Sequence, residues 1–495
     1  MPLMKNNKLS QEIQELYSDK KQITGFLTDT VEHFKTKSVC KFLQSYKSKG
    51  IDCSDLFYNL LLCGYYNITS IWKMTGSRYF NKKSGKDSFY RLKNNSNIDW
   101  RCLLYMFVKI FFSLVNSRRN DNRFGESVLI LDDTDLPKSG RKIENIGRVF
   151  SHVLQKPILG FKGLILGYWD QTTFLPLDFS LHNEKGKNPS KPYGMPKAKL
   201  KLRFKKKRSK KQAGYKRVQE LNQSKIATAI TMIKRASKQG FRASYVLCDS
   251  WFMCSELILA VRSIKKGATH ILGAVRMDKR RYKFADGKLY NAKQLLEKLK
   301  LQKQKSYDLP ATYIETTTEY EGMKVKLFFS KFRNDKKWTL LLTTNCDISY
   351  EDAVKIYTMR WTIEVFFRES KQLFNLGKSY SSDFDGQIAD ITISMMQYIV
   401  LSLHKRVNYY ESMYELFQEQ SDLNKEMVVA EKIWKLFLSL LIKIGEELKI
   451  SFNDLFKAFS KVLTENTTLE TKNILQDFKK NYAKTQIDII KYKFA

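Results

Sequence analysis

Residues 127–135 read SVLILDDTD, and this stretch decides the fold that the sequence predicts. Four consecutive apolar residues, 128–131, followed at once by acidic ones are typical of a buried strand that ends at the edge of a sheet. Side chains alternate along a strand, so Asp133 and Asp135 share one face and Asp132 lies on the other. An aspartate at such an edge can meet a hard cation or a phosphate. For any single aspartate, a polar strand end before a turn is the commoner interpretation.

Further short apolar runs follow, each bounded by Gly, Pro, Asp or Asn, and they extend this strand into a sheet. The alternation of strands and helices that they predict is typical of a mixed α/β sheet. We expect strands at residues 162–170, 174–181, 245–249 and 270–275, and helices at residues 218–238, 251–265 and 350–373.

The sequence predicts four regions around this sheet. Residues 277–339 alternate β-branched and aromatic residues, which favours a small antiparallel sheet inserted in the fold. Residues 121–276 and 340–404 would form the α/β core. Residues 1–120 are expected to be a helical DNA-binding domain, and residues 405–495 a helical region suited to dimerisation.

A helix-turn-helix is one interpretation of the N-terminal region. Residues 68–75 and 87–93 would be its helices, joined by a Gly- and Lys-rich turn, with Asp87 capping the second helix. Arg91 and Lys93 would then face DNA. An ordinary helical hairpin with a solvated basic face is an equally good alternative.

The charge of the chain points to a polyanionic partner. Lys and Arg outnumber Asp and Glu by 87 to 50, a net charge of +37, and nucleic acid is the first candidate. A membrane is disfavoured, because the longest apolar stretches, 103–115 and 391–403, fall short of the ~20 residues that a span needs. The first residues lack a secretory signal, so we expect a cytoplasmic protein. Neither the seven cysteines nor the five histidines show metal-site spacing.

The positive charge is densest between Glu184 and Glu220, where fifteen Lys and Arg residues occur without an acid. Such a run is most often a disordered solvated loop or a localisation patch. Because it lies between two elements of the predicted core, a role in binding the DNA backbone is at least as good an interpretation.

A third acidic residue lies on the predicted helix around YTMRWTIEVFFRESK, residues 357–371. Spacings of 3, 4, 4 and 3 place five polar residues on one stripe of the helix. A surface stripe of ion pairs, worth ~0.3–0.5 kcal/mol each, is the simpler explanation of this pattern. Near two strand-end aspartates, the same stripe offers a further metal ligand flanked by groups that neutralise a phosphodiester. The stripe consists of Tyr357, Arg360, Glu364, Arg368 and Lys371.

At this stripe the chain resembles a known family. Tyr357-x2-Arg360-x3-Glu364-x6-Lys371 matches the Y-R-E-K signature of bacterial insertion-sequence transposases of the DDE superfamily, the cut-and-paste group with a β-sheet inserted in the catalytic core. Four residue types at fixed spacing make a specific match.

The resemblance extends to both strand ends. In DDT, residues 132–134, the family's first catalytic aspartate precedes Thr and maps to Asp133. VLCDSWF supplies the second as Asp249. The likeness covers roughly residues 125–375, and it implies an RNase H-like α/β core with an inserted antiparallel sheet, flanked by helical N- and C-terminal regions.

By this resemblance Asp133, Asp249 and Glu364 are the catalytic residues and hold two Mg²⁺ ions, for which Mn²⁺ substitutes. They would cleave DNA at the ends of the element and transfer the 3′-hydroxyl into target DNA. The implied partners are double-stranded DNA, as terminal inverted repeats and target, and a second copy in a homodimeric synaptic complex, with no membrane, in the bacterial cytoplasm. The remaining stripe residues, Tyr357, Arg360, Arg368 and Lys371, would contact DNA phosphates, and one of Trp338, Tyr320 and Phe332 would stack on an extruded base.

Three alternatives remain. A junction resolvase or RNase H-type nuclease would use similar carboxylates, but it does not account for the stripe, the insertion and the helical flanks together. A catalytically silent relic or repressor would bind DNA alone, and the three intact acidic residues weigh against it. A basic scaffold protein would be smaller or of lower sequence complexity.

Overall fold

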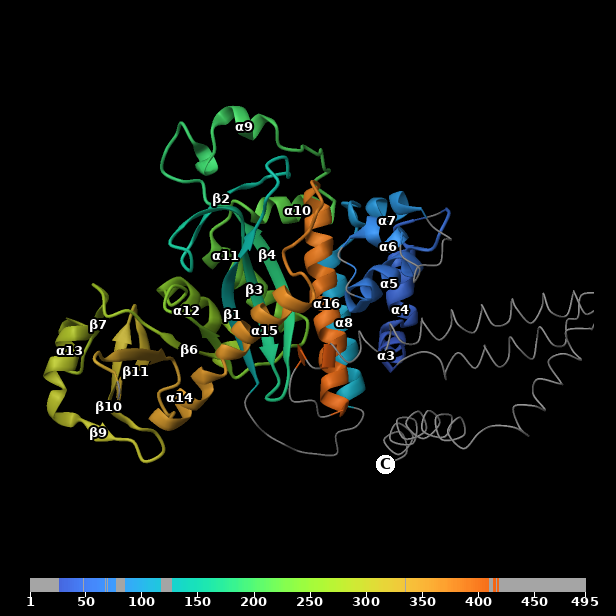
Figure 1. Ribbon diagram of the computed structural model, residues 1–495. Helices are drawn as coiled ribbons and strands as arrows, with labels where there is room; N and C mark the ends of the chain where they lie inside the picture. Colours follow the sequence, from blue (N-terminus) through green and yellow to red (C-terminus); the bar gives the residue numbers. More distant parts are fainter. Residues whose placement is uncertain are drawn as a thin grey trace, which may run out of the picture. The chain divides into compact units, whose positions relative to one another are not determined.

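The structure is a computed structural model that describes residues 26–47, 49–66, 68, 70–76, 85–116, 127–333, 335–408, 413–414 and 416–417. The stretch Gly25–Ser421 forms one compact unit (Figure 1). The predicted C-terminal region, 405–495, lies outside the described residues from 418 onward. No helix in the described part of the chain is long and apolar enough to cross a membrane.

One mixed sheet runs through this unit and bears out the predicted α/β architecture. Its order is β2-β3-β1-β5-β6-β12-β11-β10-β7-β8, with β4 paired to β3 and β9 to β10. The strands are β1 (Val128–Pro137), β2 (Gly147–Ser151), β3 (Lys156–Trp169), β4 (Phe174–His182), β5 (Tyr245–Cys248), β6 (His270–Ala274), β7 (Arg281–Lys283), β8 (Leu289–Asn291), β9 (Gln304–Lys305), β10 (Ala311–Tyr320), β11 (Met323–Phe332) and β12 (Thr339–Thr343).

Strand β1 organises the sheet. Its first four residues are buried, as an apolar run bounded by polar residues predicts. It pairs antiparallel with β3 along its whole length and parallel with β5, where Leu131 is the partner of Cys248. Strand β5 pairs parallel with β6. The carboxyl ends of β1, β5 and β6 therefore lie at one edge of the sheet.

The predicted inserted sheet differs from the structure in one respect. Its strands continue the core sheet, because β12 pairs with β6 on one side and with β11 on the other. A helix, α13 (Ala292–Lys298), and a short 3-10 turn, η4 (Lys300–Gln302), also belong to this region. Alternating residues predict strands, but they do not say which strands pair.

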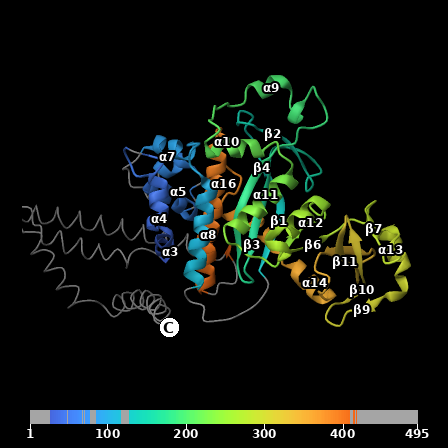
Figure 2. The same ribbon diagram turned by 180° about the vertical axis from the view of Figure 1, so that it is seen from behind.

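Helices cover both faces of the sheet. In Figure 1, α15 crosses in front of β1, and in the reverse view of Figure 2, α11 and α12 lie on the near side. The expected helix 218–238 is divided, because Ser224 caps a new helix by accepting a hydrogen bond from the amide of Ile226. These helices are α10 (Ala213–Glu220), α11 (Lys225–Lys238), α12 (Ser255–Arg262) with η3 (Ile264–Gly267), α14 (Tyr350–Thr358), α15 (Trp361–Leu373) and α16 (Phe384–Asn408).

The N-terminal helices pack on the core through α16 and β4. In the predicted helix-turn-helix, Gly85 and not Asp87 is the N-cap of the second helix. The prediction that Lys93 faces DNA was wrong, because Lys93 is buried and its ammonium lies 2.6 Å from a carboxylate oxygen of Asp390 in α16. The turn residues 77–84 lie outside the described residues. The helices are α3 (Phe26–Phe34), α4 (Lys37–Gln44), α5 (Cys53–Cys63), η1 (Gly64–Tyr66), α6 (Ile71–Gly76), α7 (Lys86–Lys93) and α8 (Trp100–Asn116).

A buried charge network joins the N-terminal helices to the sheet. Asp178 of β4 is fully buried and accepts hydrogen bonds from Arg101 of α8, at 2.7 Å, and from Arg235 of α11. Arg101 also donates to both oxygens of Glu220, at 2.7 and 2.8 Å. Burial alone would raise the pKa of Asp178, but the surrounding guanidinium groups hold it below its usual range.

Removing this carboxylate should destabilise the protein strongly. We expect Asp178→Ala to lower the free energy of unfolding by about 3–5 kcal/mol, because it leaves buried guanidinium groups without their anion. Urea denaturation at neutral pH measures the change. Asp286→Ala, which breaks an exposed pair with Lys298, is the matched control and should have little effect. Equal stability of the two variants would contradict the role of the network.

Candidate functional site

The acidic end of β1 places alternate residues on opposite faces of the sheet. Asp132 faces α15, and its Oδ2 accepts a hydrogen bond from Nη1 of Arg360 at 3.0 Å. Two residues further on, the Thr134 hydroxyl lies 2.6 Å from Nζ of Lys371. The same face of β1 therefore contacts α15 at two successive positions, as the period of a strand requires.

Asp133 lies on the other face. It is bonded to Lys225 at the start of α11, and the Lys225 ammonium lies 4.0 Å from the centre of the Trp251 ring. Asp135, on the same face, accepts a hydrogen bond from Lys162 at 2.5 Å. Both aspartates thus have a lysine partner on the side of the sheet that α11 covers.

Asp249 follows directly after β5 and lies beside Asp132. Because Leu131 and Cys248 are the last partners in the parallel ladder, the next residues, Asp132 and Asp249, both lie just beyond its end. Burial raises the pKa of Asp132 to about 7, and the negative charge of Asp249 adds to this effect, against the opposing charge of Arg360. Two carboxylates are therefore held close together at this edge.

Glu364 joins the group through Arg360, whose Nη2 donates to Oε1 of Glu364 at 2.7 Å. The predicted single helix 350–373 is instead two helices, because the chain tightens between them. The amide of Arg360 bonds to the carbonyl of Tyr357, and that of Ile363 to the carbonyl of Arg360, three residues back in each case. Tyr357 and Arg360 remain neighbours despite this break, since the Arg360 guanidinium lies 5.9 Å from the centre of the Tyr357 ring.

A glycine turn holds α15 against the end of β1. Gly377 has a φ of +80°, and a Cβ there would lie 2.7 Å from Cδ2 of Leu136, so only glycine fits. Its carbonyl accepts a hydrogen bond from Lys138, 2.5 Å away, just after β1. The turn that follows α15 is therefore tied to the end of β1.

The structure thus brings most of the predicted residues to one edge, with one difference. Asp132, which the sequence analysis did not select, shares a face with Asp249 and with the Arg360–Glu364 pair, whereas Asp133 lies on the opposite face. Strand alternation separates the two aspartates, but it does not say which face α15 covers. Arg368 is exposed on α15.

Within the described ranges, no group of three or more His, Cys, Asp or Glu side chains is close enough to hold a metal ion. The cation that now lies among these acids is Arg360. All the candidate donors are carboxylate oxygens, which suit a hard divalent ion. Burial, with the charge of Asp249 second, raises the pKa of Asp132, and a bound cation would offset both effects by favouring the charged carboxylate.

Comparison with protein families bears on this arrangement. A family model described as a DDE superfamily endonuclease matches residues 49–296, half of the chain. The chain belongs to the DDE superfamily of endonucleases. The matched part includes β1 and β5 with their aspartates, and it ends before Glu364. Comparison with curated proteins gives no match.

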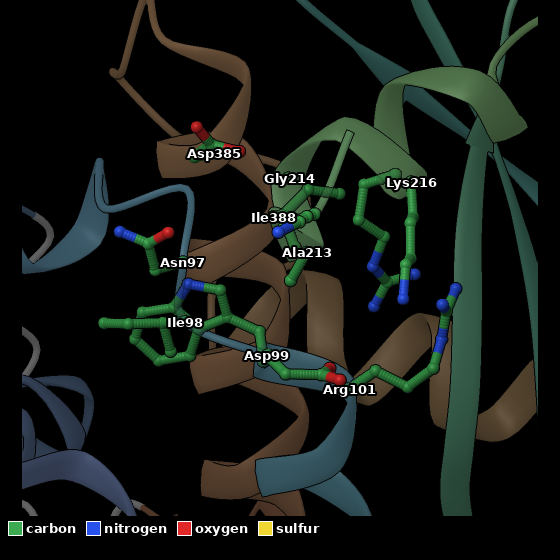
Figure 3. Close-up of a pocket in the computed structure, with 12 residues that line it drawn as sticks. Asn97, Ile98, Asp99, Arg101, Ala213, Gly214, Lys216, Asp385 and Ile388 are labelled. Carbon is green, nitrogen blue, oxygen red and sulfur yellow. The ribbon is translucent and has the colours of Figure 1, made fainter. Parts of the chain in front are cut away.

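Two pockets lie outside the carboxylate cluster of this DDE endonuclease. One, of about 630 Å³, is lined by Ser250, which follows Asp249 in the chain, and by Trp338, Arg276, Lys293 and Lys337. The other, of about 180 Å³, lies between the start of α8, α10 and the start of α16 (Figure 3). Of the two, only the first is next to a residue of the cluster.

The coupling between Asp132 and Asp249 can be measured by titration. In metal-free protein we expect the Asp132 carboxyl to titrate with a pKa of about 7. Asp249→Asn removes a negative charge and should lower that pKa. Carbon NMR of protein labelled at aspartate carboxyls, followed against pH in EDTA, measures both values.

The same shift predicts a stability change with a defined sign. Because the pKa is raised above its unfolded value of ~3.9, ionising Asp132 costs stability, which should fall as pH rises from about 4 to 7. Asp132→Asn should remove this slope, and Glu256→Gln, at an exposed acid of α12, should leave it. An Asp132 pKa near 4 in EDTA would contradict the predicted coupling.

Proposed function

We propose that this DDE endonuclease is a transposase that excises a DNA element and joins its 3′-hydroxyl ends to target DNA by a cut-and-paste route. The observation that carries this proposal is the placement of Asp132 beside Asp249, facing a helix that presents Glu364 between two cations. In an RNase H-like core, acidic residues at strand ends serve to hold the catalytic metal ions. The partners in the proposal are duplex DNA, as inverted repeats and as target, and a second copy of the chain, in the bacterial cytoplasm.

Asp132, Asp249 and Glu364 are the proposed metal ligands, and Asp133 is the alternative that the family likeness favours for the first position. Divalent ions held by these carboxylates would supply the Lewis acidity that activates water and stabilises the leaving oxygen in phosphodiester cleavage. Mg²⁺ is the proposed ion, with Mn²⁺ as a substitute, because every donor is an oxygen.

The chain's own cations would position the DNA. Arg360 donates hydrogen bonds to Asp132 and Glu364, and its fork of donors also fits a phosphate. Lys371 bonds to Thr134 beside the carboxylates, and burial lowers its pKa. Tyr357 and the exposed Arg368 extend the contact along the same stripe. These contacts would orient the scissile phosphate for attack.

Among the three aromatic candidates for base stacking, we propose Trp338. It is the one that lines the pocket next to Asp249, and that pocket also carries the cations Arg276 and Lys337. Tyr320 is buried and packs against Tyr282. A base extruded near the cleavage site could enter this pocket and stack on the indole.

The decisive experiment compares four acidic residues in one cleavage assay. A duplex carrying the inverted repeats that flank the gene is incubated with Mg²⁺, and nicking at the repeat boundary is measured. We expect Asp132→Asn, Asp249→Asn and Glu364→Gln to lose cleavage by roughly a thousandfold or more while DNA binding persists. Asp133→Asn should retain cleavage, because its carboxylate faces Lys225.

Glu256→Gln is the matched control for a surface acid and should cleave like the wild type. If Asp133→Asn loses cleavage and Asp132→Asn retains it, the first metal ligand is Asp133 and not Asp132. Binding without cleavage by the wild type in both Mg²⁺ and Mn²⁺ would overturn the enzyme proposal in favour of a DNA-binding relic or repressor.

A further inference from the structure

A basic segment, residues 183–212, connects β4 to α10 and is called here the basic arm. It contains η2 (Pro192–Gly194) and α9 (Lys197–Lys201), and it lies beside β2 and α10 (Figure 1). The structure describes every residue of it. Its exposed lysines are Lys185, Lys187, Lys191, Lys197, Lys199, Lys201, Lys205, Lys207, Lys210 and Lys211.

An acidic socket in the core anchors the arm. Arg208 donates to both carboxylate oxygens of Glu144, at 2.6 and 2.7 Å, and to Asp385 at 3.0 Å. Lys206 lies 2.8 Å from a carboxylate oxygen of Asp383 and 2.8 Å from one of Asp385. The Arg208 side chain is only 3% exposed. This part of the arm is therefore fixed by buried, charge-assisted hydrogen bonds.

The anchoring divides the cations of the arm into two groups. Lys206 and Arg208 point inward and neutralise the socket. Lys205 and Lys207, which alternate with them, are exposed, and so is Lys210. Glu184, at the start of the arm, is the arm's only acid, and none occurs from there to Glu220, so Lys205, Lys207 and Lys210 have no acidic residue near them in the sequence. The result is an ordered, positively charged surface.

This surface borders the carboxylate edge of the sheet. The arm begins after His182, the last residue of β4. His182 pairs with Lys162 of β3, and Lys162 pairs with Asp135 of β1. After α10 the chain returns to the same edge, where Lys225 is bonded to Asp133. At its far end the arm reaches the small pocket of Figure 3, where Lys211 and Lys216 are among the lining residues.

We propose that the basic arm binds the phosphate backbone of duplex DNA running past the carboxylate edge, without reading its base sequence. The inference rests on the proposed function for its choice of DNA. Lysine ammonium groups act as point charges toward phosphates, and phosphate contacts position a duplex without specifying it. The socket keeps the lysines in place, so less order has to be gained on binding.

The test is the salt dependence of DNA binding with four outward lysines neutralised. The variant carries Lys205→Gln, Lys207→Gln, Lys210→Gln and Lys211→Gln. Fluorescence anisotropy in EDTA, over a range of salt concentrations, measures binding without cleavage. Each lost contact should lower the magnitude of the slope of log K against log salt by about 0.9, roughly eightfold in affinity at 0.1 M salt. The loss should be equal for repeat-bearing and random duplexes.

A matched variant neutralises four exposed lysines at the opposite edge, Lys234, Lys238, Lys265 and Lys266, each changed to Gln. These lie at the end of α11 and in η3, before the first residues of β5 and β6. The slope should remain close to that of the wild type. An unchanged slope in the arm variant, or an equal loss in the control, would overturn the proposal.

The cleavage assay of the wild type and the salt slope of the arm variant, taken together, separate the arm proposal from the nuclease proposal. If the wild type binds DNA but never cleaves it, a reduced slope in the arm variant still supports the arm while the nuclease proposal fails. If the wild type cleaves DNA and the arm variant binds with an unchanged slope, only the arm proposal fails. Vesicles of anionic phospholipid test the rival partner. If the arm variant loses vesicle binding and keeps DNA binding, the partner of the arm is an anionic membrane and not DNA.

Discussion

The parallel pairing of β1 with β5 is the constraint on which the candidate site depends. The ladder ends at Leu131 and Cys248, so the next residues, Asp132 and Asp249, are held side by side at the edge of the sheet. Burial raises the pKa of Asp132 to about 7, and repulsion between the two carboxylates adds to the effect. The fold imposes this repulsion because the strands are bound along their lengths by hydrogen bonds and buried apolar side chains.

Arg360 offsets part of that repulsion. Its guanidinium contacts Asp132 and Glu364 together and so connects the end of β1 to α15. A single cation thus bonds two acids from different elements, and its positive charge would also attract a phosphate. Local charge repulsion is a common feature of functional sites, where the rest of the fold supplies the compensating stability.

Two other clusters of buried charge lie elsewhere in the molecule. Around Asp178 and around Arg208, buried acids are bonded to basic partners from several elements, and these clusters hold α8 and the basic arm to the sheet. The contrast is informative. These two clusters stabilise the structure, whereas the acids that share Arg360 at the sheet edge and the exposed lysines of the arm are the places where a charged partner would be bound.

The sequence by itself determined most strands of the core and the spacing of the stripe, because these follow from local periodicity in residues such as 128–131 and 357–371. It did not indicate β2, nor the breaks within the expected helices 218–238 and 350–373. It also separated Asp132 from Asp133 by alternation. Only the tertiary structure decided which aspartate faces α15, that Lys93 is buried against Asp390, that strands β7–β11 continue the core sheet and that Arg208 anchors the basic arm. These depend on contacts between residues far apart in the chain, and local periodicity does not record which distant partner a face will meet.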